Sequence, residues 1–152
     1  MRTFIRAAGL LIIDQAVLLE NPLGTELWYL PGGRLEDGET LEIALRREFR
    51  EEFDVAVTTG ALVFVVENFF PLADDVIREY GFYFRIQAED RRLAPTAPIP
   101  SRETDQFRHA WIDLERLPSL SFKPAVLVSH LFDLPQSTLF LKARDGGLKL
   151  HM

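Results

Sequence analysis

The chain has 152 residues, of which 47% are hydrophobic and 26% charged, a composition typical of a globular domain with a substantial core. Its formal net charge of −6 argues against a broad nucleic-acid interface, although a bound cation could still let an acidic protein hold a small polyanion. It has no cysteine, which excludes disulfides, thiolate metal sites and a cysteine nucleophile.

The first predicted elements are two strands near the N-terminus. They cover residues 2–13 and 16–20, and Asp14 with Gln15 supplies the tight turn between them. The apolar run 7–13 is short, Asp14 interrupts it and no small-residue cleavage pattern follows, which argues against a signal peptide. No stretch approaches the roughly 20 apolar residues that span a membrane. We therefore expect a cytoplasmic protein with no membrane partner.

A short strand over residues 27–30 and a helix over about residues 41–53 come next. The Pro-Gly-Gly sequence at 31–33 ends the strand. Thr40 is a suitable N-cap for the helix, because its hydroxyl can accept a hydrogen bond from an amide of the first turn. The pattern thus predicts a glycine-containing loop that leads into an amphipathic helix.

The rest of the chain is predicted to form strands, a polar loop and a second helix. The expected strands, the last two closing a hairpin, are residues 56–59, 61–70, 77–88, 107–112, 139–143 and 148–151. A loop with three prolines fills 89–104, and Pro124 starts a helix over 125–131. This order predicts an α/β fold with one mixed β-sheet and two main helices, in a single domain over residues 1–152.

Three carboxylates lie near the end of the first helix, at Glu48, Glu51 and Glu52. A helix C-terminus already carries partial negative charge, so these side chains need compensation. At about 100° per residue, Glu52 falls within the apolar stripe of Leu45 and Phe49, and the other two acids border it. This argues against the alternative that they only keep the helix soluble, because acids at an apolar edge are costly unless they are paired.

A divalent cation is the simplest compensation for these acids. Glu48 and Glu52, four residues apart, can reach one ion, and Glu51 adds a third ligand. Hard oxygen ligands favour Mg²⁺ or Mn²⁺ over zinc. Arg47 stands one turn before Glu51 and could pair with it. Such a metal beside a glycine-containing loop suggests chemistry on phosphates.

The loop before the helix has features that match this chemistry. Gly32 and Gly33 let the backbone approach a ligand closely. Glu39 is stabilised by the helix dipole and could hydrogen-bond to the loop or to Arg47. A double glycine alone more often marks only a turn, but its fixed spacing from the helix makes the signal stronger.

The segment from Gly33 to Val55 resembles the Nudix box, Gly-x5-Glu-x7-Arg-Glu-U-x-Glu-Glu-x-Gly-U, in which U is a bulky apolar residue. The matching residues are Gly33, Glu39, Arg47, Glu48, Phe49, Glu51, Glu52 and Val55. Asp54 replaces the last glycine, and we expect it to take the left-handed conformation at a small cost in stability. The resemblance implies a Nudix fold over nearly the whole chain, with a mixed sheet sandwiched between helices.

The same resemblance implies an enzyme that hydrolyses the pyrophosphate bond of a nucleoside diphosphate linked to another moiety. Its substrate class includes ADP-ribose, nucleotide sugars, dinucleotides and ordinary or oxidised nucleoside triphosphates. By analogy, Glu48, Glu51 and Glu52 hold Mg²⁺ or Mn²⁺, while Glu39 and Arg47 support the loop. The partner is then a small nucleotide-derived molecule and not a nucleic-acid polymer, and the sequence leaves a homodimer open.

The identity of the general base stays open among Glu48, Glu79 and Glu103. Glu103 lies in the polar loop, where a closing residue would be well placed, but an ordinary solvated acid explains it equally well. The alternative function is a catalytically silent nucleotide-binding sensor or scaffold of the same fold. Such a protein should have lost some of the metal-binding carboxylates, and all three are present here.

Overall fold

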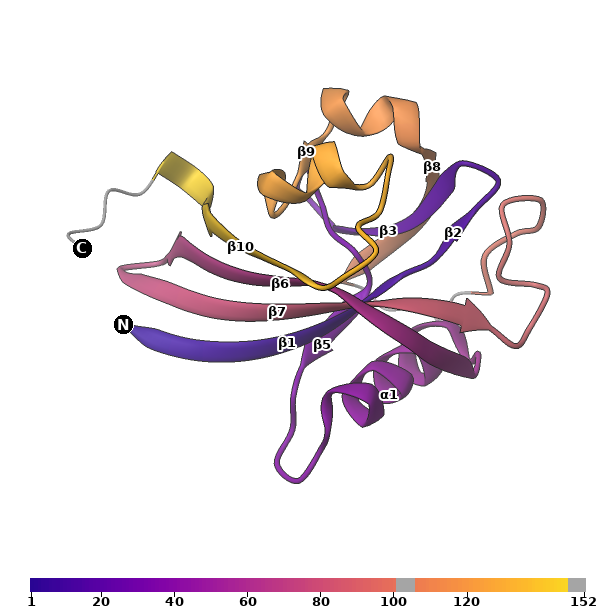
Figure 1. Cartoon of the computed structure of the whole chain (residues 1–152), viewed down its shortest axis with the longest axis horizontal. Helices are drawn as coiled ribbons and strands as arrows, with labels where there is room; N and C mark the ends of the chain where they lie inside the picture. The colour runs from indigo at the N-terminus through magenta and orange to yellow at the C-terminus, as the bar shows by residue number, and fades with distance from the viewer. Residues whose placement is uncertain (101–105, 148–152) are drawn as a thin grey trace.

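The structure is a computed structural model that describes residues 1–100 and 106–147 (Figure 1). Its elements are β1 (Arg2–Leu10), β2 (Ile12–Ile13), β3 (Ala16–Pro22), β4 (Leu27–Trp28), β5 (Gly32–Arg34), α1 (Leu41–Phe53), β6 (Val57–Leu72), β7 (Asp75–Ala88), β8 (Phe107–Asp113), the 3-10 helix η1 (Leu114–Ser119), β9 (Ser121–Phe122), η2 (Ala125–His130), β10 (Leu139–Arg144) and η3 (Asp145–Gly147). Within these residues, the structure has no helix both long enough and apolar enough to span a membrane.

The main sheet is mixed, as predicted, and has five strands in the order β10-β6-β7-β1-β5, but the described residues also form two smaller sheets where the sequence predicted a single sheet. Strand β1 runs parallel to β7 and β10 runs parallel to β6, while the β6–β7 and β1–β5 pairs are antiparallel. A second, antiparallel sheet has the order β2-β3-β8, and β4 pairs with β9 in a two-stranded sheet. The second sheet brings β8, from late in the chain, next to β3.

Helix α1 and the 3-10 helices η1 and η2 lie on opposite sides of the main sheet (Figure 1). On the α1 side, Phe49 and Phe53 pack with Ala7, Phe84 and Ile86. The core on the other side includes Ala8, Leu10, Phe64, Val66, Tyr83, Leu117, Leu127 and Leu131. Burying each phenylalanine contributes roughly 1.5–3 kcal/mol. The predicted arrangement, a mixed sheet with helices on both faces, is confirmed.

The predicted second helix has a different type from the one expected. Residues 125–130 form the 3-10 helix η2, where an α-helix over 125–131 was predicted. The run is short, it contains two β-branched valines, and prolines lie on both sides of it, all of which favour a 3-10 turn over a longer α-helix. Leu127 is nevertheless fully buried, so the segment still covers the sheet.

Some strand predictions also change. The strand predicted over residues 2–13 breaks at Leu11 into β1 and β2, which belong to different sheets. The segments 56–59 and 61–70 form one strand, β6, whose register against β7 shifts between Thr59 and Leu62. The intervening Gly60 therefore marks an irregularity inside a strand and does not end one. In the predicted closing hairpin, the first arm is β10, which pairs in parallel with β6, and the second arm, 148–151, lies outside the described residues.

Candidate active site

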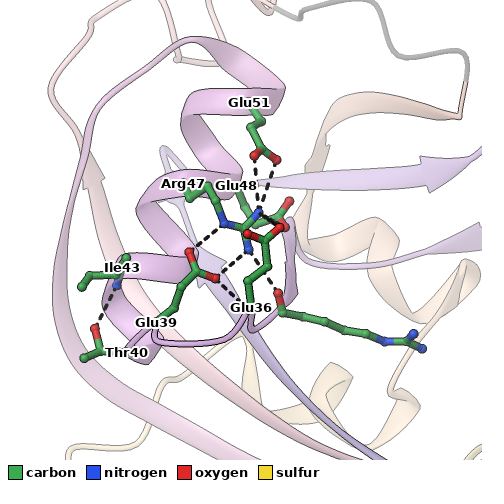
Figure 2. Close-up of polar contacts among 8 residues, drawn as sticks. Glu36, Glu39, Thr40, Ile43, Arg47, Glu48 and Glu51 are labelled. Atoms are coloured by element: carbon green, nitrogen blue, oxygen red, sulfur yellow. Dashed lines mark hydrogen bonds and ion pairs between the residues drawn. The ribbon is translucent and has the colours of Figure 1, made fainter.

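Helix α1 begins and ends where the sequence predicts. Thr40 Oγ1 accepts a hydrogen bond from the Ile43 amide at 3.2 Å (Figure 2). At the other end, Asp54 takes the left-handed conformation, with φ 52° and ψ 40°, and its N–H donates to the Arg50 carbonyl at 3.0 Å. The caps define the two ends of the helix, and burial of Leu45, Phe49 and Phe53 turns its apolar stripe toward the sheet.

Arg47 joins the helix to the loop before it. Its Nε donates to Glu39 Oε2 at 2.7 Å, and its Nη2 donates to Glu39 Oε1 at 3.0 Å and to the Arg34 carbonyl at 3.1 Å (Figure 2). Glu39 Oε1 also accepts from the Glu36 amide at 2.8 Å. The Arg47 hydrogen bond is the main cause that lowers the pKa of Glu39. The predicted role of Glu39 and Arg47 as supports of the loop therefore has a geometric basis.

The same guanidinium meets two of the three predicted metal ligands. Arg47 Nη1 lies 2.9 Å from Glu48 Oε1 and 3.4 Å from Glu51 Oε2 (Figure 2). Burial raises the pKa of Glu48, and the Arg47 guanidinium opposes that rise. The Glu51 side chain is 56% exposed, whereas that of Glu48 is 16% exposed. Arg47 therefore compensates part of the negative charge at this end of the helix.

Both predicted loop glycines lie against other parts of the protein. A Cβ added to Gly33 would collide with the Glu48 carboxylate, and one added to Gly32 would collide with the Ala7 carbonyl of β1. The absence of a side chain at Gly33 therefore makes room for Glu48. Close approach to a ligand, which the sequence suggested, stays a prediction.

Glu52 points to the other side of this region and meets residues that sequence reasoning missed. Its Oε2 lies 3.6 Å from Nε2 of His109 on β8, and Glu20 Oε2 of β3 lies 3.8 Å from the same nitrogen. Burial raises the pKa of Glu52, while His109 opposes the rise. Among the described residues, Glu52 Oε2 is buried and has no hydrogen-bond partner. It is an oxygen that needs a partner.

Glu20 is a buried carboxylate that was not among the site residues predicted from the sequence. Its Oε1 accepts a hydrogen bond from Arg6 Nη2 at 3.1 Å, and the same nitrogen donates to the Leu30 carbonyl at 2.6 Å. The only available signal was an acid at the end of the apolar run Ala16-Val-Leu-Leu19 in a predicted strand. Charged residues are rarely fully buried without a partner, and this pattern could have marked Glu20 as functional.

Two adjoining hollows lie over these residues. The first, of about 470 Å³, is lined by Glu20, Glu48 and Glu52, together with both loop glycines. The second, of about 280 Å³, is lined by aromatic, apolar and polar side chains that include Asn68, Phe70, Pro71, Glu79, Tyr83 and Asp145. Arg6 and Tyr29 line both hollows. A larger hollow of about 680 Å³ lies elsewhere, and none of the predicted site residues that the structure describes lines it.

The acids provide suitable donors for a hard cation, although they are not gathered around one point. Within the described residues, no three His, Asp or Glu side chains stand close enough together to hold an ion. Glu48 and Glu51 face Arg47, while Glu52 faces His109. The unpartnered Glu52 oxygen nevertheless fits a cation that takes oxygen ligands.

The three alternatives for the general base fall in different places. Glu48 lines the first hollow and Glu79 lines the second. Burial raises the pKa of Glu79, and the positive charges of Arg6 and Arg34 oppose that rise. Glu103 lies outside the described residues.

Known proteins resemble this chain in sequence and in fold. The curated 8-oxo-dGTP diphosphatase of Proteus vulgaris is 42% identical over 61 residues, which are 38% of this chain and 54% of that protein. The chain thus spans about half the length of this relative. The structure of the Mutator MutT protein from Bacillus halodurans matches with a TM-score of 0.70 and 15% identity, covering 93% of this chain and 89% of that one. An ADP-ribose pyrophosphatase from Streptococcus suis matches with a TM-score of 0.60 and 14% identity, covering 91% and 98%.

At these low identities the two solved structures establish a shared fold alone. The match to a family model is more specific, because it is made on the sequence itself. The model of the NUDIX domain matches residues 3–131, which include the loop, the whole of α1 and the strand that carries His109. Since this match covers most of the 152 residues, the chain belongs to the NUDIX domain family.

Proposed function

We propose that this chain is a hydrolase that cleaves the pyrophosphate bond of a nucleoside diphosphate derivative and depends on Mg²⁺ or Mn²⁺. The observation that carries the proposal is the hollow in which Glu20, Glu48 and Glu52 lie beside Arg6. Carboxylates next to a guanidinium suit a ligand that brings both a cation and phosphate oxygens. The family match and the phosphohydrolase names of the similar proteins support the same class.

Glu48, Glu51 and Glu52 would hold the cation. When bound, it supplies polarisation of a phosphate oxygen and a lower pKa for an attacking water. Arg47 restrains Glu48 and, through Glu39, the loop beside it. The bidentate contact of Arg47 is with Glu39, while its Nη1 restrains the proposed ligand Glu48 by a hydrogen bond of 2.9 Å and lies 3.4 Å from Glu51 Oε2.

Arg6 is the residue best placed to contact phosphate groups, because it lines both hollows. Hydrogen bonds with the described residues engage only its Nη2, which leaves Nη1 and Nε to donate to phosphate oxygens. The carboxylate of Glu20 compensates the charge of Arg6, and the carboxylate of Glu79 also attracts it electrostatically. A phosphate bound at Arg6 would have the first hollow, with its carboxylates, on one side. The second hollow, with its aromatic side chains, would lie on the other side.

The second hollow is suited to the nucleoside part of the substrate. Tyr29, Phe70 and Tyr83 offer aromatic surfaces, and Asn68 and Asp145 offer polar groups. Among the similar proteins, one is named for 8-oxo-dGTP and another for ADP-ribose, and both compounds contain a purine nucleotide. We therefore include purine nucleoside di- and triphosphate derivatives in the proposed substrate class.

The proposal is tested by measuring phosphate or nucleotide release from a panel of substrates. The panel holds ADP-ribose, a nucleotide sugar, a dinucleoside polyphosphate and oxidised and ordinary triphosphates, each with Mg²⁺ and with a chelator. We expect hydrolysis of at least one compound that stops when the cation is removed. Tight binding with no hydrolysis of any compound would instead favour the silent sensor.

Two further parts of the proposal come from the sequence. One is that residues 1–152 form a single catalytic domain, and the other is that it acts in the cytoplasm. The first is tested by cooperative unfolding of the whole chain in one transition. The second is tested by fractionating the cells that make the protein.

A further inference from the structure

His109 lies on β8 directly opposite Glu20 on β3, in the antiparallel pair that forms the second sheet. Its side chain is 1% exposed, and its ring packs edge-on against Phe53 of α1, with centroids 4.5 Å apart. Among the described residues, neither Nδ1 nor Nε2 has a hydrogen-bond partner. The imidazole is therefore fully buried between two strands and the helix with both nitrogens unsatisfied.

A purely structural role does not explain a histidine in this place. A buried polar atom without a hydrogen bond destabilises the folded protein. Phenylalanine would fill similar space and keep the ring contact with Phe53, without leaving nitrogens unpaired. The polar edge of His109 therefore needs a different explanation.

That edge faces two carboxylates that come from two other elements. Nε2 lies 3.6 Å from Glu52 Oε2 of α1 and 3.8 Å from Glu20 Oε2 of β3. Both distances exceed a good hydrogen bond, but an N–H donor needs to move less than about 1 Å to make one. Glu20 is already held through its other oxygen by Arg6, whereas Glu52 Oε2 has no partner among the described residues. Glu52 is the carboxylate that still requires a donor.

We propose that His109 is a positioning residue for Glu52, which it holds by Oε2 so that Oε1 is left to face the hollow. This inference rests on the proposed function, because it gives Glu52 the role of a metal ligand. A hydrogen bond from His109 on β8 holds the flexible Glu52 side chain of α1 in one rotamer. The register between β3 and β8 in turn fixes the position of His109. Partners that orient metal ligands in this way commonly change metal affinity 10–100-fold when they are removed.

Two substitutions separate positioning from packing. His109→Phe keeps the ring and its contact with Phe53 but removes both nitrogens, while His109→Gln restores a side-chain N–H donor. His130→Phe is a matched control, since His130 also packs against a phenylalanine, Phe64, at 6.0 Å and does not line either hollow. Mn²⁺ affinity is measured by calorimetry on the protein without substrate, beside the melting temperature and the separate values of kcat and KM.

We expect His109→Phe to melt at the same or a higher temperature than the parent while binding Mn²⁺ about tenfold or more weakly. His109→Gln should recover most of the affinity, and His130→Phe should bind Mn²⁺ as the parent does. Parent-like Mn²⁺ binding by His109→Phe, equal losses in the Phe and Gln variants, or a His109→Phe protein that does not fold would each overturn this inference alone. No Mn²⁺ uptake by the parent would overturn the proposed function itself.

Discussion

Glu39 and Arg47 stand eight residues apart and are joined by two parallel hydrogen bonds, with N–O distances of 2.7 and 3.0 Å. One residue precedes helix α1 and the other lies inside it, so this contact closes the loop onto the helix (Figure 2). Only a planar guanidinium can make this paired contact while also reaching Glu48.

Arg47→Lys tests this contact. Lysine keeps the charge but loses the two parallel donors, so we expect turnover to fall roughly 10–100-fold as the loop and Glu48 lose their alignment. The melting temperature should also fall. The exposed neighbour Arg46 provides the control, and Arg46→Lys should leave both values unchanged. Full activity of Arg47→Lys would show that the paired geometry is dispensable.

Gly33→Ala tests the room that the loop leaves for Glu48. The added methyl group would collide with the Glu48 carboxylate, so that side chain or the loop must move. We expect cation-dependent turnover to fall at least about tenfold while the protein stays folded, as judged by circular dichroism. Gly60→Ala is the control, because its added Cβ comes no closer than 3.4 Å to the Arg85 carbonyl. Equal rates in the two variants would contradict the assigned role of Gly33.

Glu79 gives a prediction for pH dependence. Burial raises its pKa above the ordinary 4.5, so the unfolded chain loses this proton at a lower pH than the folded protein does. The stability of the parent therefore falls as pH rises through 4.5 and stops falling, for this group, above the folded-state pKa. Because glutamine does not titrate, the Glu79→Gln variant does not show this loss of stability as pH rises.

The stability difference between Glu79→Gln and the parent should consequently increase from about pH 4 to about pH 7. Urea unfolding at several pH values measures it. A difference that stays constant or shrinks as pH rises would mean that the folded-state pKa of Glu79 is not raised.

Glu52→Gln tests a proposed metal ligand, and Glu103→Gln tests one of the possible general bases. We expect Glu52→Gln to lower turnover by roughly a thousandfold, because it removes a proposed metal ligand, and Glu103→Gln to lower it less severely. Glu42→Gln is the control on the same helix and lines neither hollow. Single-turnover rates at saturating substrate make the comparison. An unchanged rate in Glu103→Gln would remove Glu103 from the possible bases and leave Glu48 and Glu79.

The features that the sequence predicts best are those that depend on neighbouring residues. The Thr40 cap, the left-handed Asp54 and the pairing of Arg47 with Glu39 all involve residues within a few turns of one helix. Helical periodicity also places Glu52 within the apolar stripe, and its side chain is 15% exposed. Local geometry largely determines these outcomes, so a single sequence is enough to infer them.

The features that the sequence does not reveal depend on which strands pair. Glu20 and His109 meet because β3 and β8 pair across almost ninety positions of sequence, in a register that no local pattern specifies. Arg6 acquires its place between the two hollows in the same way, through the pairing of β1 with β5 and β7. The type of the η2 helix also differs from the prediction, because a six-residue run is too short to stabilise an α-helix by itself.

Cation binding by the acids at the end of α1 is tested most directly by titrating the purified protein with Mn²⁺, with Glu52→Gln titrated beside it. We predict saturable uptake by the parent and binding at least about tenfold weaker in the variant. Equal uptake by the two proteins, or no uptake by the parent with or without a diphosphate compound, would contradict a metal site at Glu52.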